Sequence, residues 1–289
     1  MIGRWEPIER GRLARTPGEC LAPRLWQGCI GLWAPCLMRA GDKIQEWTGR
    51  GTRFQGTMTN MDGADWVSSP LGWALDFDGS NDYLDLPAAA DSRLAPTTGI
   101  TIFAVINITG SVSVRQYITN AAGGGTPAGF GFGISDAVAN QTKWYTGSGA
   151  SGHNLQGGTT MTAGQWYSVA ATYFPAAAGT NKFTYLDGKV DQSGSTTNTM
   201  AFTSAVSGIC RYENSASQYF PGRLALMGVW NYAMSAGQIA QLHRDPIAMF
   251  RRRRAAVTKF VPAPFTADMV IDPIEIYPRD AAPLYFAAC

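Results

Sequence analysis

Charged residues and long apolar runs are both scarce in this sequence. Asp, Glu, Lys and Arg make up 15% of the 289 residues. No stretch approaches the roughly 18 consecutive apolar residues of a membrane-spanning helix, so we expect no membrane partner. The N-terminal segment alternates Arg, Glu and Pro and has no apolar core of the signal-peptide type. We therefore expect a protein that is made and kept in the cytoplasm unless another process releases it.

The residue types of most catalytic and metal sites are also few. The five cysteines are an odd number without a C-x-x-C pair, so we expect reduced thiols and no zinc site. Neither His153, in a Gly- and Ser-rich loop, nor His243, at a predicted helix end, lies beside a nucleophile-elbow pattern. Glu46 and Glu213 are the only glutamates between residues 31 and 245, and neither has a second carboxylate beside it for a glycosidase pair. The sequence predicts a protein that is not an enzyme and requires no cofactor.

Glycine, with 33 residues, and aromatic residues, at 11%, are plentiful. Together with alternating apolar segments they favour strands and turns over helices. The segment GITIFAVINI predicts a strand, and its apolar face holds Ile100, Ile102, Ala104, Ile106 and Ile108.

Further elements follow from local signals. Residues 165–174 and 222–231 predict two more strands. The second of these has three apolar residues on one face, which are Leu224, Leu226 and Trp230. Asp187 and Gly188, between alternating runs, predict a tight hairpin because both turn positions need a positive φ. Ser235, with Gln three residues later, forms a capping box that opens a short helix over about residues 236–244.

The chain divides into three segments by pattern. Residues 1–30 show no lasting period and predict an extended N-terminal arm, whereas residues 31–245 contain the strand signals. Residues 246–289 are rich in proline and predict an extended C-terminal arm. This arm has too many apolar residues for a freely disordered tail, so we expect it to dock on a partner.

The stretch LDFDGSNDYLDL, residues 75–86, gathers several carboxylates. It fails the spacing of an EF-hand loop. The pattern instead predicts a strand, a turn on residues 78–81, and a second strand on which Tyr83 and Asp85 share one face. Asp and Asn side chains in such a turn cap its own backbone amides.

The central segment resembles a known family. The stretches GLWAPCL, LGWALDFDGSNDYLDLP, TIFAVINI, AGQWYSVAATYF, FTYLDGKVDQSG and PGRLALMGVWNYAMSAGQIAQL occur in the order found in laminin-G-like, concanavalin-A-like jelly-roll domains. The resemblance covers about residues 31–245. It implies an all-β fold of two antiparallel sheets packed as a jelly-roll sandwich, with one short helix and the two arms outside it.

The resemblance also implies a calcium site. Similar domains often hold one calcium ion at an edge of the sandwich through an Asp and backbone carbonyls. Asp78 and Asn81 are the residues that match this role, and other loops would supply the remaining ligands. Calcium is therefore the one cofactor to test.

An arginine run follows the predicted helix. The run consists of Phe250, Arg251, Arg252, Arg253 and Arg254. It is either exposed to solvent or a docking site for a partner. In a docking site, each arginine would form paired hydrogen bonds to a carboxylate or phosphate. Nearby aromatic residues are sparse, which argues against a nucleic-acid groove.

Two functions fit these features. The first is a structural protein of a virus particle, either a bacteriophage capsid decoration protein or part of a tail appendage, made in the host cytoplasm. Its partners would be other virion proteins, further copies of itself and host surface glycans. A sandwich followed by Asp-Pro-x-x-Met-Phe-Arg is similar to phage-encoded chains. The second is a carbohydrate-binding or adhesion domain of a bacterial surface protein.

Overall fold

The computed structural model describes residues 5, 13–14, 19–38, 40, 44–45, 55–87, 93–110, 115–122, 128–135, 138–175, 177–202, 206–212 and 218–252. The chain divides into two units, Met1–Arg253 and Arg254–Cys289. The second unit lies outside the described residues, and the fold below is that of the first.

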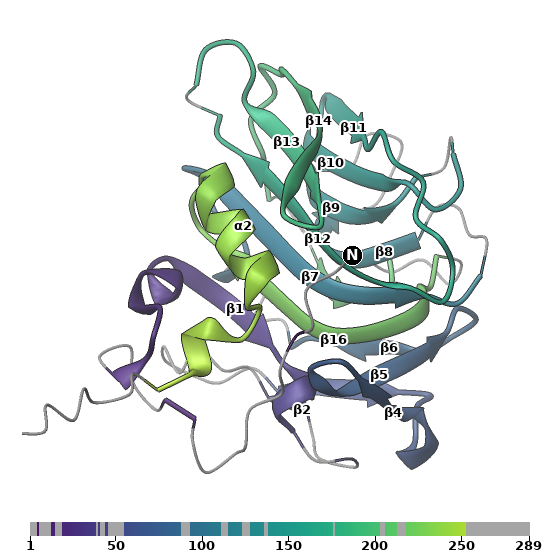
Figure 1. The fold of residues 1–289 in the computed structure, drawn as a ribbon. Coiled ribbons are helices and arrows are strands. Elements are labelled where there is room, and N and C mark those ends of the chain that lie inside the picture. Colours follow the sequence, from purple (N-terminus) through teal and green to yellow (C-terminus); the bar gives the residue numbers. More distant parts are fainter. Residues whose placement is uncertain are drawn as a thin grey trace, which may run out of the picture. The chain divides into compact units, whose positions relative to one another are not determined.

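The first unit is a sandwich of two antiparallel sheets (Figure 1). Sheet 1 has the order β14-β13-β12-β7-β16-β5-β4, and β1 also pairs with β16. Its strands are β1 (Cys29–Trp33), β4 (Trp66–Ser69), β5 (Gly72–Asp78), β7 (Ile100–Ile108), β12 (Trp166–Tyr173), β13 (Lys182–Leu186), β14 (Lys189–Gly194) and β16 (Pro221–Trp230).

Sheet 2 has the order β11-β10-β9-β8-β15-β6-β3-β2. Its strands are β2 (Ile44–Gln45), β3 (Gln55–Thr59), β6 (Tyr83–Asp85), β8 (Arg115–Ala122), β9 (Ala128–Ile134), β10 (Thr142–Ser148), β11 (Gly152–Gln156) and β15 (Val206–Ile209). The predicted two-sheet antiparallel sandwich is confirmed.

The main core lies between the sheets. In β7 the predicted apolar face, from Ile100 to Ile108 in steps of two, points into this core. Phe103 and Val105 on the other face of β7 are also buried, but in a second apolar cluster. The outer face of sheet 1 is therefore apolar and must itself be covered.

Short helices cover that outer face. They are the 3-10 helices η3 (Pro23–Trp26), η4 (Pro35–Leu37) and η6 (Ala248–Phe250) and the α-helix α2 (Ala236–Arg244). Figure 1 shows α2 in front of sheet 1. We call the apolar residues that pack on this face the outer cluster; they include Phe103, Leu226 and Trp230 from the sheet and Leu25 and Phe250 from the covering segments.

The helix and hairpin predictions are confirmed. Ser235 is the N-cap of α2, and it forms the expected reciprocal capping box with Gln238. Asp187 and Gly188 turn between β13 and β14 with φ of 49° and 75°. A Cβ atom at Gly188 would lie 2.7 Å from Cβ of His243, so this turn accepts glycine alone where α2 packs against it.

Strand β16 differs from the predicted face pattern. Leu224 belongs to the core between the sheets, whereas Leu226 and Trp230 belong to the outer cluster. The register of β16 against β7 shifts between Leu224 and Leu226. The prediction of one shared face was wrong because a β-bulge at Ala225 inserts one residue into the alternation.

The described residues of both predicted arms pack into the sandwich. Strand β1 already begins at Cys29, and Leu25 is 1% exposed. At the other end Met249 and Phe250 are each 1% exposed. The predicted boundaries at residues 31 and 245 therefore cut through packed structure, because sequence periodicity does not reveal that these segments cover an apolar sheet face. The remaining residues of the arms lie outside the described part.

Within the described residues, α2 is too short to cross a membrane, and no other helix is long and apolar enough to do so.

Candidate functional site

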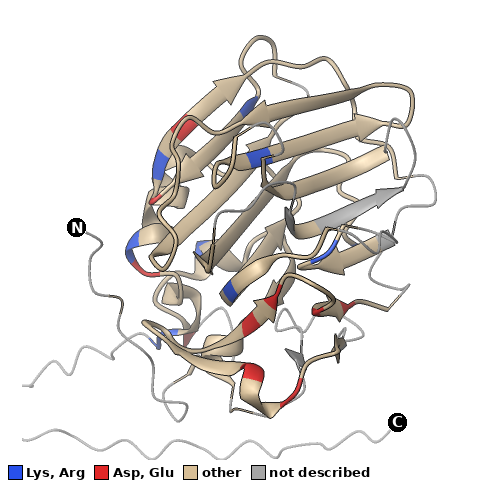
Figure 2. Cartoon of the chain, turned by 90° about the vertical axis from the view of Figure 1, so that its right-hand side faces the viewer, with Lys and Arg blue, Asp and Glu red and all other residues tan. Residues whose placement is uncertain are grey.

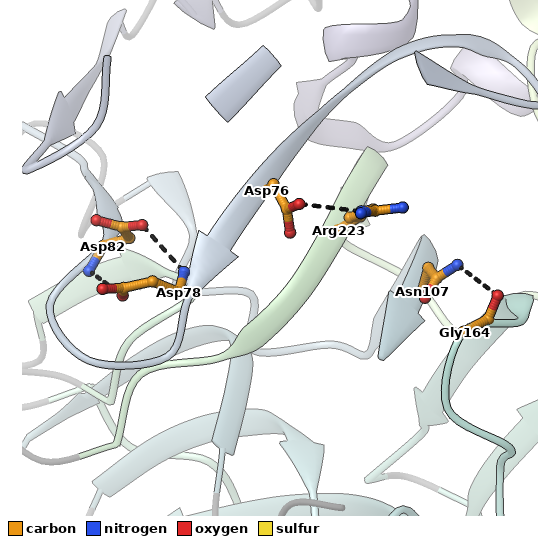
Figure 3. A network of polar contacts seen from close by, with 6 residues as sticks. All are labelled: Asp76, Asp78, Asp82, Asn107, Gly164 and Arg223. Carbon is orange, nitrogen blue, oxygen red and sulfur yellow. Dashed lines mark hydrogen bonds and ion pairs between the residues drawn. The ribbon is translucent and has the colours of Figure 1, made fainter. Parts of the chain in front are cut away.

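The turn after β5 crosses from sheet 1 to sheet 2 and is held by Asp78. Its Oδ1 accepts hydrogen bonds from the backbone N–H groups of Ser80 at 2.7 Å, Asn81 at 3.1 Å and Asp82 at 3.4 Å. The N–H of Asp78 in turn donates to Oδ2 of Asp82 at 3.0 Å (Figure 3). The predicted capping of the turn's own amides is confirmed.

The two carboxyl groups of this turn have pKa values shifted in opposite directions. Burial raises the pKa of Asp82, the hydrogen bond from the Asp78 amide opposes this, and the carboxylates of Asp78, Asp65 and Asp76 raise it further. Partial burial also acts to raise the pKa of Asp78, but the hydrogen bonds from Ser80 and the following amides outweigh it, so its pKa is lowered. Acidic residues, drawn in red, gather in this part of the sandwich (Figure 2).

The predicted calcium ligands Asp78 and Asn81 lie in this turn. Oδ1 of Asp78 is already engaged by backbone amides, and the carbonyl oxygen of Asn81 accepts a hydrogen bond from Nδ2 of Asn60 at 2.9 Å. Within the described part of the chain, no group of three or more His, Cys, Asp or Glu residues is placed to hold a metal ion. Calcium binding stays a prediction, which calorimetric titration with calcium tests.

The outer face of sheet 2 carries a polar and aromatic cluster near this turn. Nη2 of Arg211 lies 2.6 Å from Oδ1 of Asp85, and its guanidinium carbon lies 4.1 Å from the centre of the Tyr83 ring. The rings of Tyr83 and Tyr219 are 6.0 Å apart and inclined by 32°. We call Tyr83, Asp85, Arg211 and Tyr219 the Tyr83 cluster.

The Tyr83 cluster is open to a ligand. The side chain of Asp85 is 50% exposed, while that of Arg211 is 14% exposed and is fixed by its contacts. Tyr83 and Tyr219 are half-buried, which leaves part of each ring at the surface. The cluster combines aromatic rings, a carboxylate acceptor and a guanidinium donor, so it can contact both apolar and hydroxyl-bearing parts of one ligand.

Strand β9 of sheet 2 alternates aromatic residues and glycines. Phe130 and Phe132 point into the core between the sheets. Gly129, Gly131 and Gly133 take the alternate positions, on the other face of the strand, and they are buried as well. This strand therefore places no side chains of its own on the outer face of sheet 2.

A second set of polar residues crosses the outer face of sheet 1. Asp76 and Arg223 are cross-strand partners, and Nε of Arg223 donates to Oδ2 of Asp76 at 3.0 Å (Figure 3). Asn107 is the cross-strand partner of Arg223 on the other side, and Trp166 is that of Asn107. We call Asp76, Arg223, Asn107 and Trp166 the polar row.

The predicted docking residues lie where the two terminal segments meet. Phe250 is 1% exposed and packs against the ring of Trp26 at 5.5 Å, so it is a core residue and not available to a partner. Nε of Arg251 bonds to Oδ2 of Asp245 at 2.6 Å. Nε of Arg252 donates to the carbonyl of residue 13 at 3.1 Å, and its Nη2 lies 3.6 Å from Oε2 of Glu19.

These contacts mean that the described arginines bind the protein itself. Isolated β-bridges join Leu13 to Arg251 and Cys20 to Arg252, so the N-terminal segment holds the outgoing C-terminal segment. The predicted docking residues Arg253 and Arg254 lie outside the described residues.

His243 lies in an arrangement that superficially suggests a catalytic triad. Its Nδ1 is 2.8 Å from Oγ of Ser168 and 3.9 Å from Oδ1 of Asp187. In a working triad the serine and the carboxylate contact opposite ring nitrogens, whereas here both approach the same one. Ser168 is also 2% exposed. These contacts fasten α2 to sheet 1, and the Nε1–H of Trp5 adds a bond to the His243 carbonyl at 2.7 Å.

The second histidine is near a buried lysine. His153 was expected in a surface loop but lies on β11 opposite Thr146. Nζ of Lys182, which is 0% exposed, donates to the His153 carbonyl at 2.7 Å and to Oγ1 of Thr146 at 3.0 Å. The same Nζ atom lies 5.3 Å from the centre of the Trp144 ring. Burial lowers the pKa of Lys182 well below its ordinary value, but the amine is sealed from any substrate.

A protein-family model of the laminin G type, described as "Concanavalin A-like lectin/glucanases superfamily", matches residues 78–240, more than half of the chain. The chain belongs to this superfamily. The resemblance seen in the strand and turn motifs is thereby confirmed. A comparison with curated proteins gives no match.

Several solved structures share the fold. Domain 4 of the extracellular arabinanase AbnA from Geobacillus stearothermophilus, in complex with arabinotriose, is 14% identical with a TM-score of 0.55, over 74% of this chain and 98% of that one. A Trypanosoma rangeli sialidase is 13% identical with a TM-score of 0.53, over 77% of this chain and 33% of that one.

A structure of botulinum neurotoxin type C, whose cell entry depends on interaction with two ganglioside molecules, is 10% identical with a TM-score of 0.53, over 77% of this chain and 52% of that one. The chain therefore spans about a third of the sialidase and about half of the toxin structure. At these identities the superfamily sandwich is the shared feature.

Sequence reasoning missed most of the Tyr83 cluster. The shared face of Tyr83 and Asp85 was predicted from alternation, and it is the outer face of sheet 2 as observed. Arg211 lies 126 positions from Asp85 along the chain, so no local pattern connects them. No local sequence pattern singles out Tyr219 either.

Proposed function

We propose that the protein is a non-enzymatic domain that binds a neutral glycan through the Tyr83 cluster. The observation that carries this proposal is the meeting of two half-buried tyrosines, a half-exposed carboxylate and a guanidinium on one sheet face. Aromatic rings contact the apolar face of a sugar ring, Asp85 accepts bonds from its hydroxyl groups and Arg211 donates to them. Membership in a lectin/glucanase superfamily supports a saccharide as the ligand.

The carboxyl groups favour binding without hydrolysis. A glycosidase needs two carboxyl groups that flank the scissile bond, one of them with a raised pKa. Asp85 is the single carboxylate of the Tyr83 cluster and is paired with Arg211 at 2.6 Å. Among the described carboxyl groups, Asp82 has a raised pKa, but it is 4% exposed and bonded within its turn.

A glycan array tests this proposal. The full-length protein should retain neutral oligosaccharides, and Tyr83→Ala should weaken retention of the best one about tenfold, because the sugar loses a ring to pack on and Arg211 loses the ring that holds it. Phe174→Ala removes another exposed aromatic ring, 45% exposed, and should leave retention unchanged. Undiminished binding by Tyr83→Ala would place the site elsewhere, and release of reducing sugar from the retained glycan would show that the protein is an enzyme.

A second function is favoured by the junction of the terminal segments. We also propose that the protein is a structural component of a virus particle, as a phage capsid decoration protein or tail-appendage part made in the host cytoplasm. The bridges from Leu13 and Cys20 to the residues that precede the C-terminal unit support this role. They hold Arg251 and Arg252 in place shortly before residues 254–289 in the sequence, and these residues are the arm that we propose reaches other virion proteins or a second copy of this chain.

Particle composition tests the second function. Purified particles should contain the protein at a fixed stoichiometry, and a chain ending at Arg253 should be lost from them while its sandwich stays folded. Particles that lack the full-length protein, or that incorporate the shortened chain equally well, would contradict this function. Neither result would bear on glycan binding by the isolated sandwich, so the two proposed functions are tested independently.

A further inference from the structure

The polar row forms a continuous line across four strands of sheet 1. Asp76 on β5, Arg223 on β16, Asn107 on β7 and Trp166 on β12 are successive cross-strand partners, and all four occupy outer-face positions. Neighbouring strands lie about 4.8 Å apart, so the row spans about 14 Å. The next residues inward on the same face, such as Val105, belong to the outer cluster.

Arg223 is held by a single hydrogen bond. Its Nε donates to Asp76, while its terminal nitrogens have no partner within the described residues. Figure 3 shows the guanidinium between Asp76 and Asn107. The side chains of Arg223 and Asp76 are 37% and 27% exposed. The donors that an arginine normally offers to a ligand are therefore still available at the surface.

Asn107 supplies an acceptor beside these donors. Its Nδ2 donates to the carbonyl of Gly164 at 3.0 Å, and its residue is 3% exposed. Its Oδ1 is buried and accepts no hydrogen bond within the described part of the chain. A buried acceptor without a donor is unfavourable, so a ligand hydroxyl that reaches Oδ1 and donates to it would gain from doing so.

The loop that holds Asn107 borders open space. Gly164 has a φ of +82°, and a Cβ atom there would meet nothing within 4 Å. Trp166, two residues later, is half-buried and packs on the outer cluster, so part of the residue is at the surface. An indole side chain therefore stands at one end of the row and a carboxylate at the other.

We propose that the polar row is a second saccharide site, specific for a neutral oligosaccharide and separate from the Tyr83 cluster. Its order of carboxylate, guanidinium, amide oxygen and indole offers acceptors and donors to ring hydroxyls and an apolar surface to a ring face. Asp76 beside Arg223 disfavours an acidic ligand, and Arg223 disfavours a metal cation. The two sites lie on opposite outer faces of the sandwich, so neither needs the other.

Nuclear magnetic resonance of the full-length protein tests the proposal, with a panel of neutral trisaccharides that includes arabinotriose as probes. The indole N–H signal of Trp166, assigned by its disappearance in Trp166→Phe, should shift in a saturable way with at least one probe. Asp76→Asn and Arg223→Gln should each weaken this binding about tenfold. Lys189→Gln, which removes an equal charge from the exposed edge strand β14, should not.

Tyr83→Ala separates this inference from the proposed function. The Trp166 shift should survive in that variant, even if the Tyr83 cluster proves to bind no glycan. The proposal is overturned if no neutral trisaccharide shifts the Trp166 signal, or if the shift persists undiminished in both Asp76→Asn and Arg223→Gln. Tighter binding of a carboxylated trisaccharide than of its neutral counterpart would also overturn it.

Discussion

The two outer faces of the sandwich differ in what covers them. On sheet 1, apolar residues such as Phe103 and Leu226 lie beneath α2 and the terminal segments, and the polar row crosses part of the same face. On sheet 2, β9 has buried glycines at its outer-face positions and β6 presents Tyr83 and Asp85. The difference indicates that most of the outer face of sheet 1 anchors the rest of the chain and leaves only the polar row for a ligand, whereas sheet 2 presents the Tyr83 cluster.

Removing the covering of sheet 1 should have the largest effect. Phe250→Ala should lower the free energy of unfolding by about 3–5 kcal/mol because it leaves a cavity in the outer cluster. Leu21→Ala, in the adjoining N-terminal segment but 56% exposed, is the matched control and should change it by less than about 0.5 kcal/mol. Urea unfolding measures both. A small loss of unfolding free energy for Phe250→Ala would mean that the outer face of sheet 1 is stable without this covering residue.

The turn that links the two faces should come next. Asp78→Ala removes the acceptor of three backbone amides and should cost about 1–2 kcal/mol at pH 7. Because the pKa of Asp78 is lowered, its stabilisation is present above the ordinary value of 3.8 and is lost as pH falls through the folded-state pKa. In thermal unfolding, the difference in melting temperature between Asp78→Ala and the wild type should therefore become smaller in acid. A difference that stays constant with pH would argue against charge-dependent capping.

Asp82 in the same turn should show the opposite pH dependence and a smaller effect. Its folded-state pKa is raised, so its protonated form favours folding and this contribution is lost as pH rises through that pKa. Asp82→Asn stays uncharged and keeps an acceptor for the Asp78 amide. The variant should melt above the wild type at pH 7 and together with it at pH 3. A lower melting temperature at pH 7 would show that the ionised carboxylate is needed.

The polar row should contribute least to stability. Asp76 and Arg223 form a partly exposed ion pair, which is worth about 0–1 kcal/mol. Asp76→Asn should therefore unfold within about 1 kcal/mol of the wild type in urea. A much larger loss would mean that the row stabilises sheet 1, and the row would then resemble the rest of that face instead of contrasting with it.

The sandwich itself was predictable because strand and turn signals are local. Alternation gave the core-facing side of β7, and Asp187 with Gly188 gave the hairpin between β13 and β14 directly. The bulge at Ala225 was not predictable, since one inserted residue leaves no mark on composition. The packing of Phe250 was missed for a different reason: the apolar surface it covers is built by strands far away in the sequence.

The candidate sites were less predictable than the fold. One stretch, residues 75–86, supplies Asp76 to sheet 1 and both Tyr83 and Asp85 to sheet 2, because its turn crosses between the sheets. Their partners Arg211 and Arg223 come from much later strands or loops. Charge pairing over such separations depends on strand order, which periodicity alone does not fix.

A crystal structure of the full-length protein with its best-retained array glycan tests the central claim most directly. The account predicts an intact saccharide against Tyr83 and Tyr219, with a hydroxyl group bonded to Asp85. A cleaved saccharide, or one bound with the Tyr83 cluster untouched, would contradict it.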